Sequence, residues 1–253
     1  MKEFSFSVDG TQLFAYEEGE GVPIVMLHGG IADHRAAWPL VAPLVSSHRV
    51  IAPDLRGSGR SWCATLLTFE RLADDLAALL DHLGLPRAVI GGVSGGSGVA
   101  IAFALRHAAR VAALVIVAPV YAGRETGLTR EQQGLFAWMQ SLASQAPAKG
   151  PAALHPMFEN LPPHIREQAY AAVEGYDVAS IAATGQFLAS GAEPFASSAD
   201  LRRLQVPTLL VRAADAVHPE AVSQLYATTI PDCRSVPGSR EVAAEIAEFL
   251  ASG

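Results

Sequence analysis

The sequence predicts an α/β protein with a mostly parallel, doubly wound β-sheet and a helical insertion. Short, almost wholly apolar runs alternate with segments of helical periodicity, as expected for parallel strands covered on both faces. Residues 122–198 break this alternation, because their patterns are helical with no strand between them. We therefore expect a core made of residues 1–121 and 199–253, and a helical cap over residues 122–198.

Composition narrows the class of protein. The chain has 253 residues, of which 50% are hydrophobic and 17% are charged, as expected of a globular protein with a sizeable core. A net charge of -7 argues against nucleic acid or an anionic membrane as a partner. Cys63 and Cys233 lie far apart in the sequence and are expected to be buried thiols, not a disulfide or a metal site.

The sequence carries no targeting pattern. The N-terminus, "MKEFSFSVDG", alternates like a strand and lacks the apolar block of a signal peptide. No stretch approaches the roughly 20 apolar residues that cross a bilayer. We expect a cytoplasmic protein.

The first elements follow from alternation and apolar runs. Residues 4–18 alternate on either side of Asp9-Gly10, which predicts a β-hairpin. Residues 22–28 and 48–54 are nearly all apolar and predict buried strands. Between these strands, helical spacing predicts a helix that starts near Ala32–Asp33.

The clearest helix spans residues 68–84. Thr68 is its expected N-cap, Glu70 lies in its first turn and Gly84 ends it. The remaining core elements are strands at 87–93, 111–120, 206–215 and 233–236, and helices at 96–109, 219–228 and 240–251.

The insertion contains three helical patterns, at residues 128–145, 162–176 and 177–190. We expect them to lie over the carboxyl edge of the sheet, where open α/β folds bind ligands.

The stretch "VIGGVSGGSGVA" (89–100) contains the pattern G-x-S-x-G centred on Ser94, with a strand before it and a helix after it. A serine in a strained turn needs neighbours without Cβ atoms, which Gly92 and Gly96 provide. The alternative, a phosphate-binding loop, lacks its lysine. The pattern therefore favours an exposed nucleophilic hydroxyl.

A nucleophilic serine that attacks a carbonyl needs backbone N–H donors for the oxyanion. Gly95 follows the serine at a helix N-terminus, and Gly30 in "MLHGGI" (26–31) is the second candidate. The alternative for the Gly29–Gly30 pair is an ordinary tight turn. His28 is expected to be a packed, hydrogen-bonded side chain that shapes this loop.

Five motifs in this order and spacing, "LHGG", "PDLRGSGRS", "GVSGGS", "PTLLVRAAD" and "VAAEIAEFL", resemble the α/β-hydrolase superfamily. The resemblance covers residues 1–120 and 200–253. It implies that Ser94 is the nucleophile, that Gly30 and Gly95 form the oxyanion hole, and that Asp215 is the acid of a catalytic triad. It also implies that residues 54–61 form a structural turn, so that Arg56 has no catalytic role.

A serine at the nucleophile position makes the chain similar to esterases, lactonases, C–C hydrolases and cofactor-free perhydrolases. The branches that cleave C–halogen bonds or epoxides have an aspartate there. The resemblance implies no cofactor and no metal, and no His/Asp/Glu cluster in the sequence has ligand spacing.

The sequence departs from the family pattern where a histidine normally follows the last strand. That stretch reads "CRSVPGSREVAAEIAEFL", and no histidine occurs after His218. His218 is the first candidate for the missing base. It lies three residues after Asp215, so that the two side chains can lie on one face and hydrogen-bond if the segment turns. The alternatives are His155 or His164 from the cap, a loop role for His218 before a helix starting at Pro219, or no histidine base at all.

The remaining histidines are expected to serve in surface or core packing; the four considered are His34, His48, His82 and His107.

Two functions remain open. The first is a serine hydrolase of small apolar carboxylic esters or lactones, with Ser94, a displaced base and an apolar lid. The second is a non-hydrolytic member of the fold, either a pseudoenzyme that binds a small apolar ligand or a lyase or cyclase whose substrate carries its own base. The missing histidine favours the second, and the intact Ser94, Gly30, Gly95 and Asp215 favour the first.

Overall fold

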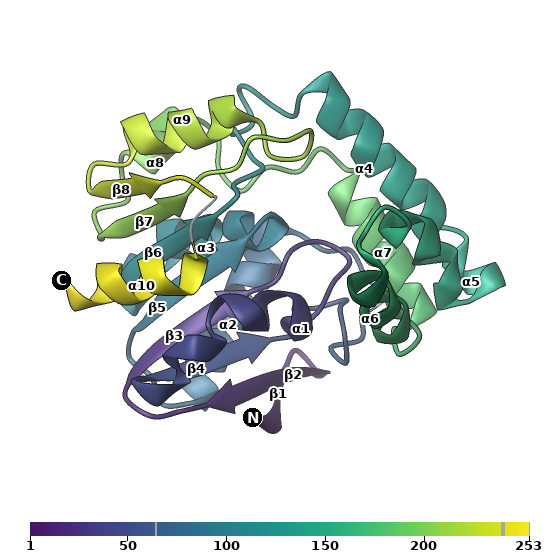
Figure 1. The fold of residues 1–253 in the computed structure, drawn as a ribbon, viewed down its shortest axis with the longest axis horizontal. Coiled ribbons are helices and arrows are strands. Elements are labelled where there is room, and N and C mark those ends of the chain that lie inside the picture. The colour runs from purple at the N-terminus through teal and green to yellow at the C-terminus, as the bar shows by residue number, and fades with distance from the viewer. Residues whose placement is uncertain (64, 239–240, 253) are drawn as a thin grey trace.

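A computed structural model of the chain describes residues 1–63, 65–238 and 241–252 and confirms the predicted α/β class (Figure 1). The strands, in chain order, are β1 (Lys2–Val8), β2 (Thr11–Glu18), β3 (Val22–Leu27), β4 (His48–Pro53), β5 (Ala88–Val93), β6 (Val111–Val117), β7 (Thr208–Val211) and β8 (Cys233–Val236). Within the described residues they form one eight-stranded sheet in the order β1-β2-β4-β3-β5-β6-β7-β8. Only the β1–β2 and β2–β4 pairs in that sheet are antiparallel.

The helices fall into two groups. Those that accompany the sheet are α1 (His34–Ala37), α2 (Phe69–His82), α3 (Gly95–Arg106), α8 (Ser198–Leu201), α9 (Glu220–Thr229) and α10 (Val242–Ala251). Those that lie away from the sheet, between β6 and α8 in the chain, are α4 (Arg130–Ala143), α5 (Ala146–Lys149), α6 (Pro163–Val173) and α7 (Val178–Leu188). Short 3₁₀ helices span Trp38–Leu40, Ala42–Ser46, Ala108–Arg110 and Pro151–Phe158.

The prediction of one continuous helix between the third and fourth strands is wrong, because the α-helix there is much shorter. Asp33 caps it as expected, accepting from the Arg35 backbone N–H, but α1 is a single turn. Two 3₁₀ helices follow, each with a proline in its first two positions, Pro39 and Pro43. Proline lacks a backbone N–H and clashes with the preceding turn, so the α-helix cannot continue.

The strands are apolar on both sides because each side of the sheet has its own core. In β3, Val25 and Leu27 pack into one core with α2, α3 and α9. Ile24 and Met26 point to the opposite side and pack with α1 and α10. All four side chains are at most 1% exposed, which explains why the strand reads as a continuous apolar run.

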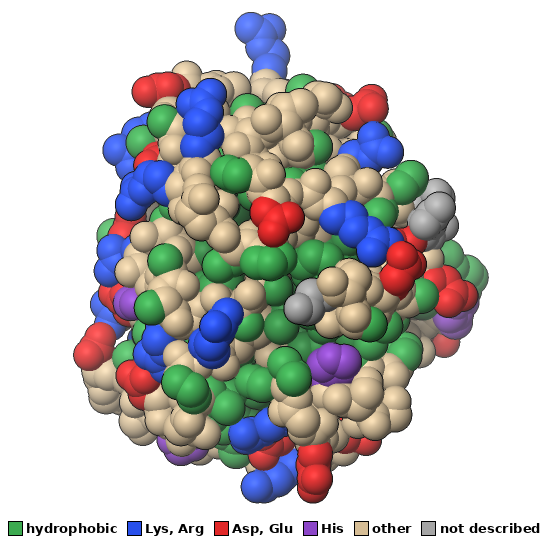
Figure 2. All heavy atoms as spheres, turned by 90° about the vertical axis from the view of Figure 1, so that its left-hand side faces the viewer, with side chains coloured by type: hydrophobic (Ala, Val, Ile, Leu, Met, Phe, Trp, Pro, Cys, Tyr) green, Lys and Arg blue, Asp and Glu red, His purple; other side chains and the backbone are tan. Residues whose placement is uncertain are grey.

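Charge is dispersed on the surface. On the face shown in Figure 2, basic and acidic side chains lie interspersed, with apolar side chains between them. Exposed ion pairs contribute little to stability, so the two apolar cores dominate the energetics of the fold. Among the described residues, no helix is both long enough and apolar enough to span a bilayer.

Helices α4 to α7 gather beyond one side of the sheet, whereas α8 lies beside α9 (Figure 1). Within this group α7 packs closely on α4, because Gly185 has no side chain. A Cβ at residue 185 would lie 2.5 Å from the Cβ of Ala143. The described residues between β6 and β7 form no strand.

The two connections of this helical group to the core run side by side. Arg124 N–H donates to the Phe195 carbonyl and Glu125 N–H donates to the Ala196 carbonyl, at 3.1 and 3.0 Å. Beside them, Gly123 N–H donates to Oε2 of Glu193 at 3.0 Å. The Glu193 carboxylate is thus the side chain that joins the entering and leaving segments.

Glu193 is 7% exposed, and among the described residues its Oε1 atom has no hydrogen-bond partner. Burial raises the pKa of this carboxyl to about 7, although the Gly123 N–H bond opposes the shift. The protonated acid is therefore favoured in the folded state. Its contribution to stability is present below the ordinary pKa near 4.5 and is lost as the pH rises through about 7.

We expect Glu193→Gln to remove this pH dependence, since the amide keeps the acceptor for Gly123 N–H and carries no charge. The free energy of unfolding of the variant minus that of the wild type should be larger at pH ~8.5 than at pH ~5, by about 1–3 kcal/mol. Urea unfolding at both pH values measures this. Glu167→Gln, an exposed position on α6, is the control and should show no such gain. An identical pH dependence in wild type and Glu193→Gln would contradict the interpretation.

Candidate active site

Ser94 lies at the junction of β5 and α3 with a backbone φ of 54° and ψ of -121°. Positive φ is costly for a residue with a Cβ, and such a conformation persists only where its surroundings fix it. Ser94 N–H donates to the Val117 carbonyl at 3.0 Å, and Ser97 N–H donates to the Ser94 carbonyl at 2.9 Å. The strand on one side and the helix on the other thus hold the turn.

The glycines around Ser94 are required by close backbone approach. A Cβ on Gly92 would lie 2.2 Å from the Gly96 carbonyl oxygen. A Cβ on Gly96 would lie 2.4 Å from the carbonyl oxygen of His28. Side chains at either position would push α3 away from β5 or from the loop after β3. With glycine there, Ser94 stays half-buried.

The loop after β3 lies against this turn. A Cβ on Gly29 would be 3.2 Å from the Ser94 Cβ, and a Cβ on Gly95 would be 3.3 Å from the backbone nitrogen of Gly30. The Gly95 amide also lies at the N-terminus of α3, where the helix dipole favours negative charge. Both sequence-predicted donor residues are therefore neighbours of the serine.

His28 fixes the shape of this loop. It is fully buried, and its Nε2 accepts from the Leu55 backbone N–H at 3.0 Å. Its Nδ1 lies 2.7 Å from the Gly29 carbonyl oxygen, so the proton resides on Nδ1 and is donated there. Burial lowers the pKa of His28, which keeps the ring neutral.

The structure brings His218 and Asp215 to Ser94. Nε2 of His218 lies 2.9 Å from Oγ of Ser94. Nδ1 of the same ring lies 2.9 Å from each carboxylate oxygen of Asp215. The ring therefore bridges the hydroxyl and the carboxylate, with one nitrogen facing each.

Asp215 and His218 meet because the loop after β7 forms a tight turn. Asp215 N–H donates to the His218 carbonyl at 3.1 Å, and Oδ1 of Asp215 accepts from the N–H groups of Val217 and His218. Burial alone would raise the pKa of Asp215, but the bonds from His218 and the backbone outweigh it and lower the pKa. The carboxylate, whose side chain is also 57% exposed to water, is therefore ionised at neutral pH.

The other candidate histidines lie elsewhere. His155 stacks on Tyr170, with ring centroids 3.9 Å apart, and pairs with Glu174, while His164 is exposed at the start of α6. Neither lines the cavity beside Ser94. Ser239 and Arg240, which stand where the family histidine is expected, lie outside the described residues.

The cavity that contains Ser94 and His218 has a volume of about 190 Å³. Phe136 and Met139 of α4 and Leu188 of α7 reach it from the helical group between β6 and β7. Sequence patterns gave no signal for these residues, because each lies on an ordinary apolar helix face. Six apolar or aromatic side chains line the cavity: Val120, Tyr121, Phe136, Met139, Leu188 and Val217.

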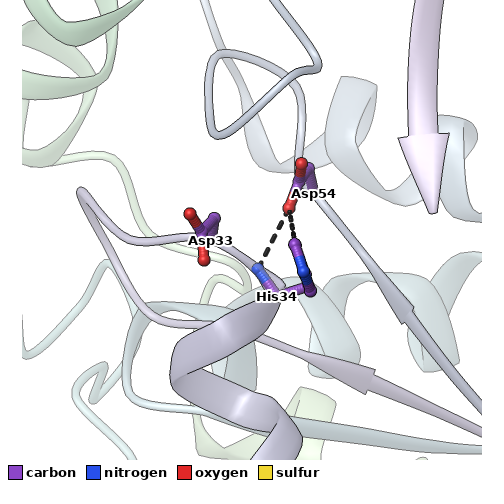
Figure 3. Close-up of side chains that lie close together, drawn as sticks. All are labelled: Asp33, His34 and Asp54. Atoms are coloured by element: carbon purple, nitrogen blue, oxygen red, sulfur yellow. Dashed lines mark hydrogen bonds and ion pairs between the residues drawn. The ribbon is translucent and has the colours of Figure 1, made fainter. Parts of the chain in front are cut away.

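A second polar cluster, made of Asp33, His34 and Asp54, lies buried beside the loop after β3. Figure 3 shows the His34 ring and the His34 backbone nitrogen both directed at Asp54, with Asp33 standing apart. Those two contacts are 2.7 and 3.0 Å long, and Asp54 also accepts from the Arg60 N–H at 2.9 Å. The oxygens of this cluster are already used by N–H donors, which argues against a cation site.

Asp33 instead links the core to the helical group. Arg35 donates to both of its carboxylate oxygens, and Tyr176 Oη donates to Oδ2 at 3.1 Å. Arg35 also reaches the Ala172 carbonyl of α6, at 3.3 Å. Burial alone would raise the pKa of Asp33, but the bonds from Arg35 outweigh it and lower the pKa.

Comparison with known proteins places the site in context. The sequence matches the family described as "alpha/beta hydrolase fold" over residues 22–242. It is 38% identical to a 2-hydroxymuconate semialdehyde hydrolase from a Pseudomonas species over 114 residues, which make up 43% of this chain and 40% of that relative. The chain thus spans less than half the length of this relative.

Solved structures of other proteins match over nearly the whole chain, among them an esterase and a lactone-degrading enzyme. A thermophilic esterase from Thermogutta terrifontis superposes with a TM-score of 0.80 at 26% identity, covering 100% of this chain and 99% of its own. An N-acyl homoserine lactone degrading enzyme superposes with a TM-score of 0.71 at 26% identity, covering 98% and 99%.

The bond between Tyr176 and Asp33 yields a stability prediction. Tyr176→Phe removes one hydrogen bond to a buried carboxylate that keeps its arginine partner, so we expect a loss of about 1–2 kcal/mol of unfolding free energy. Chemical denaturation measures this. Tyr170→Phe, where the ring stacks on His155, is the control and should change stability by less than about 0.5 kcal/mol. Equal stabilities of both variants and the wild type would show that the bond contributes nothing.

Proposed function

This chain belongs to the α/β-hydrolase fold family, and we propose that within this family it is a serine hydrolase of small apolar carboxylic esters or lactones. One observation carries the proposal. Oγ of Ser94 lies 2.9 Å from Nε2 of His218, whose Nδ1 lies 2.9 Å from both oxygens of Asp215. This is the arrangement that activates a serine hydroxyl, and it is defined by geometry and not by sequence order.

In the proposed mechanism the ionised Asp215 holds the His218 proton on Nδ1, so that Nε2 is free to accept the proton of Ser94. The deprotonated Oγ attacks the substrate carbonyl carbon. The carbonyl oxygen becomes an oxyanion, which the N–H groups of Gly30 and Gly95 stabilise.

His218 then gives its proton to the leaving alkoxide, and the C–O bond of the ester breaks to leave an acyl group on Ser94. Water attacks this acyl-enzyme, with His218 as base, and the carboxylic acid departs as Oγ regains its proton. In a lactone the leaving alkoxide belongs to the same molecule, so a single hydroxy acid is released.

The cavity supports an apolar substrate. Among the described residues that line it, His218 is the only titratable side chain apart from Tyr121, and a charged acyl group would lose its hydration without a partner among them. We propose that α4 and α7, which supply Phe136, Met139 and Leu188, act as a cap that selects the acyl or ring portion. The esterase and the lactone-degrading enzyme among the structural relatives agree with this substrate class.

The position of the proposed base is unusual for the family. His218 follows Asp215 by three residues, in the same turn, instead of following the last strand. The non-hydrolytic alternative, a ligand-binding protein or a lyase, predicts no covalent labelling of Ser94.

A fluorophosphonate probe and p-nitrophenyl butyrate test the proposal together. Wild type should be labelled rapidly and should hydrolyse the ester. Ser94→Ala and His218→Ala should each lose about 10³-fold or more in turnover and lose rapid labelling. His155→Ala, a histidine outside the cavity, is the control and should keep both activities.

Absence of labelling in the wild type, together with tight binding of an apolar ligand, would instead support the non-hydrolytic alternative. Full activity of His218→Ala would refute the role of His218 as the base, but it would not refute the role of Ser94 as the nucleophile.

Asp215→Asn tests the carboxylate. The amide neither carries charge nor fixes the histidine tautomer, so turnover should fall by roughly 10²–10⁴-fold with little change in KM. Asp232→Asn, at an exposed position before β8, is the control. Steady-state kinetics with p-nitrophenyl butyrate measure the effect, and unaltered turnover in Asp215→Asn would remove this residue from the mechanism.

A further inference from the structure

A second, smaller cavity of about 30 Å³ lies next to the cavity that contains Ser94. The two cavities share four lining residues, Gly30, Gly95, Tyr121 and Leu188. Because these residues border both spaces, they form the partition between them. Only Tyr121 and Leu188 contribute side chains to it.

Tyr121 is the immobile part of this partition. It is 2% exposed, and its ring packs edge-on against Phe69 with centroids 5.0 Å apart. A Cβ on Gly98 would lie 2.7 Å from its ring, so α3 presses directly on it. Changing Tyr121 would disturb the core as well as the cavity.

Leu188 is the replaceable part. It is the last residue of α7 and is 6% exposed. A Cβ on Gly30 would lie 2.9 Å from both of its terminal methyl carbons, so the isobutyl group packs directly against Gly30. No other side chain from the helices between β6 and β7 lines both cavities.

The smaller cavity offers a guest mainly apolar surface. Its polar side chains include three that are already bonded. Arg56 donates to both oxygens of Asp75 at 2.7 and 2.6 Å, and Oγ1 of Thr184 donates to the Gly57 carbonyl at 2.9 Å. His28 is bonded at both ring nitrogens. An alkyl group is therefore the fitting occupant.

We propose that Leu188 sets the acyl length that the site accepts, by closing the smaller cavity off from the larger one. The larger cavity has a volume of about 190 Å³, and an apolar cavity of ~150 Å³ holds benzene. With Leu188 in place the site takes acyl groups the size of a short chain or one ring. Truncating Leu188 to alanine removes the isopropyl end of the side chain, which joins the cavities and makes room for a longer chain. This inference rests on the proposed hydrolase function.

The kinetic test compares p-nitrophenyl butyrate with p-nitrophenyl octanoate. In Leu188→Ala the ratio of kcat/KM for octanoate to that for butyrate should rise about tenfold relative to wild type. Room for an additional methylene in a hydrophobic pocket changes kcat/KM by about this factor. Leu154→Ala is the matched control. Leu154 is fully buried in the same insertion but lines neither cavity, so its truncation lowers stability without changing the ratio.

A binding test separates this inference from the proposed chemistry. Thermal-shift titrations with 1-butanol and 1-octanol are made on Ser94→Ala and on the Ser94→Ala, Leu188→Ala double variant, neither of which needs to turn over. The double variant should bind 1-octanol about tenfold more tightly, with 1-butanol affected much less.

If wild type hydrolyses no ester, the proposed function fails and the alkanol comparison alone decides the role of Leu188. An unchanged chain-length ratio together with unchanged octanol binding overturns the partition. The same change in Leu154→Ala would overturn it too, because the effect would then come from general loosening of the insertion.

Discussion

Ser94 has a φ of 54°, and this left-handed turn between β5 and α3 is the constraint that the rest of the site accommodates. The strain, of order 1–3 kcal/mol for such a residue, persists because the surroundings leave the backbone no alternative. The Val117 carbonyl holds the Ser94 amide, and glycine at 92 and 96 allows the helix to approach within a distance that any side chain would prevent. The consequence is a hydroxyl that projects from the end of a rigid strand.

Short local turns hold in position the polar side chains that surround this hydroxyl. His28 uses both ring nitrogens to hold the Gly29–Gly30 loop, and Asp215 uses its carboxylate to cap its own loop and to hold the His218 ring. Because acid and proposed base lie in a single turn after β7, the ring can be oriented without any residue from the C-terminal segment. In the proposed mechanism this one turn therefore supplies both the acid and the base.

Helices α4 to α7 are joined to the core by several buried polar contacts. The Glu193 carboxylate joins the two connecting segments at Gly123, and Asp33 accepts from Arg35 and Tyr176. Helix α7 itself bonds to the core through Ser180, which accepts from the Cys63 N–H, and Thr184, which donates to the Gly57 carbonyl, and its last residue, Leu188, lies against Gly30. Stability and the shape of the cavity are consequently coupled, since a shift of α7 would change the space available beside Ser94.

The sequence by itself determined the class of fold, the order of strands and helices, the clearest helix, and the position of the strained serine with its glycine neighbours. These features are local, because periodicity reports which faces are buried and glycine spacing reports where the backbone turns sharply. Even so, the predicted length of the helix after Asp33 was too great, because Pro39 and Pro43 divert the chain into 3₁₀ turns. Local patterns describe single segments well and interrupted ones less well.

Only the tertiary structure decided which histidine lies at Ser94 and what lines the cavity. The spacing to Asp215 made His218 the first candidate, but spacing alone left His155 and His164 open, because the packing of distant segments decides which loop reaches Ser94. The lining side chains of α4 and α7 lie tens of residues from Ser94 and are ordinary members of apolar helix faces. Their meeting depends on how distant segments pack on one another, and that is a property of the whole chain, which no short stretch of sequence specifies.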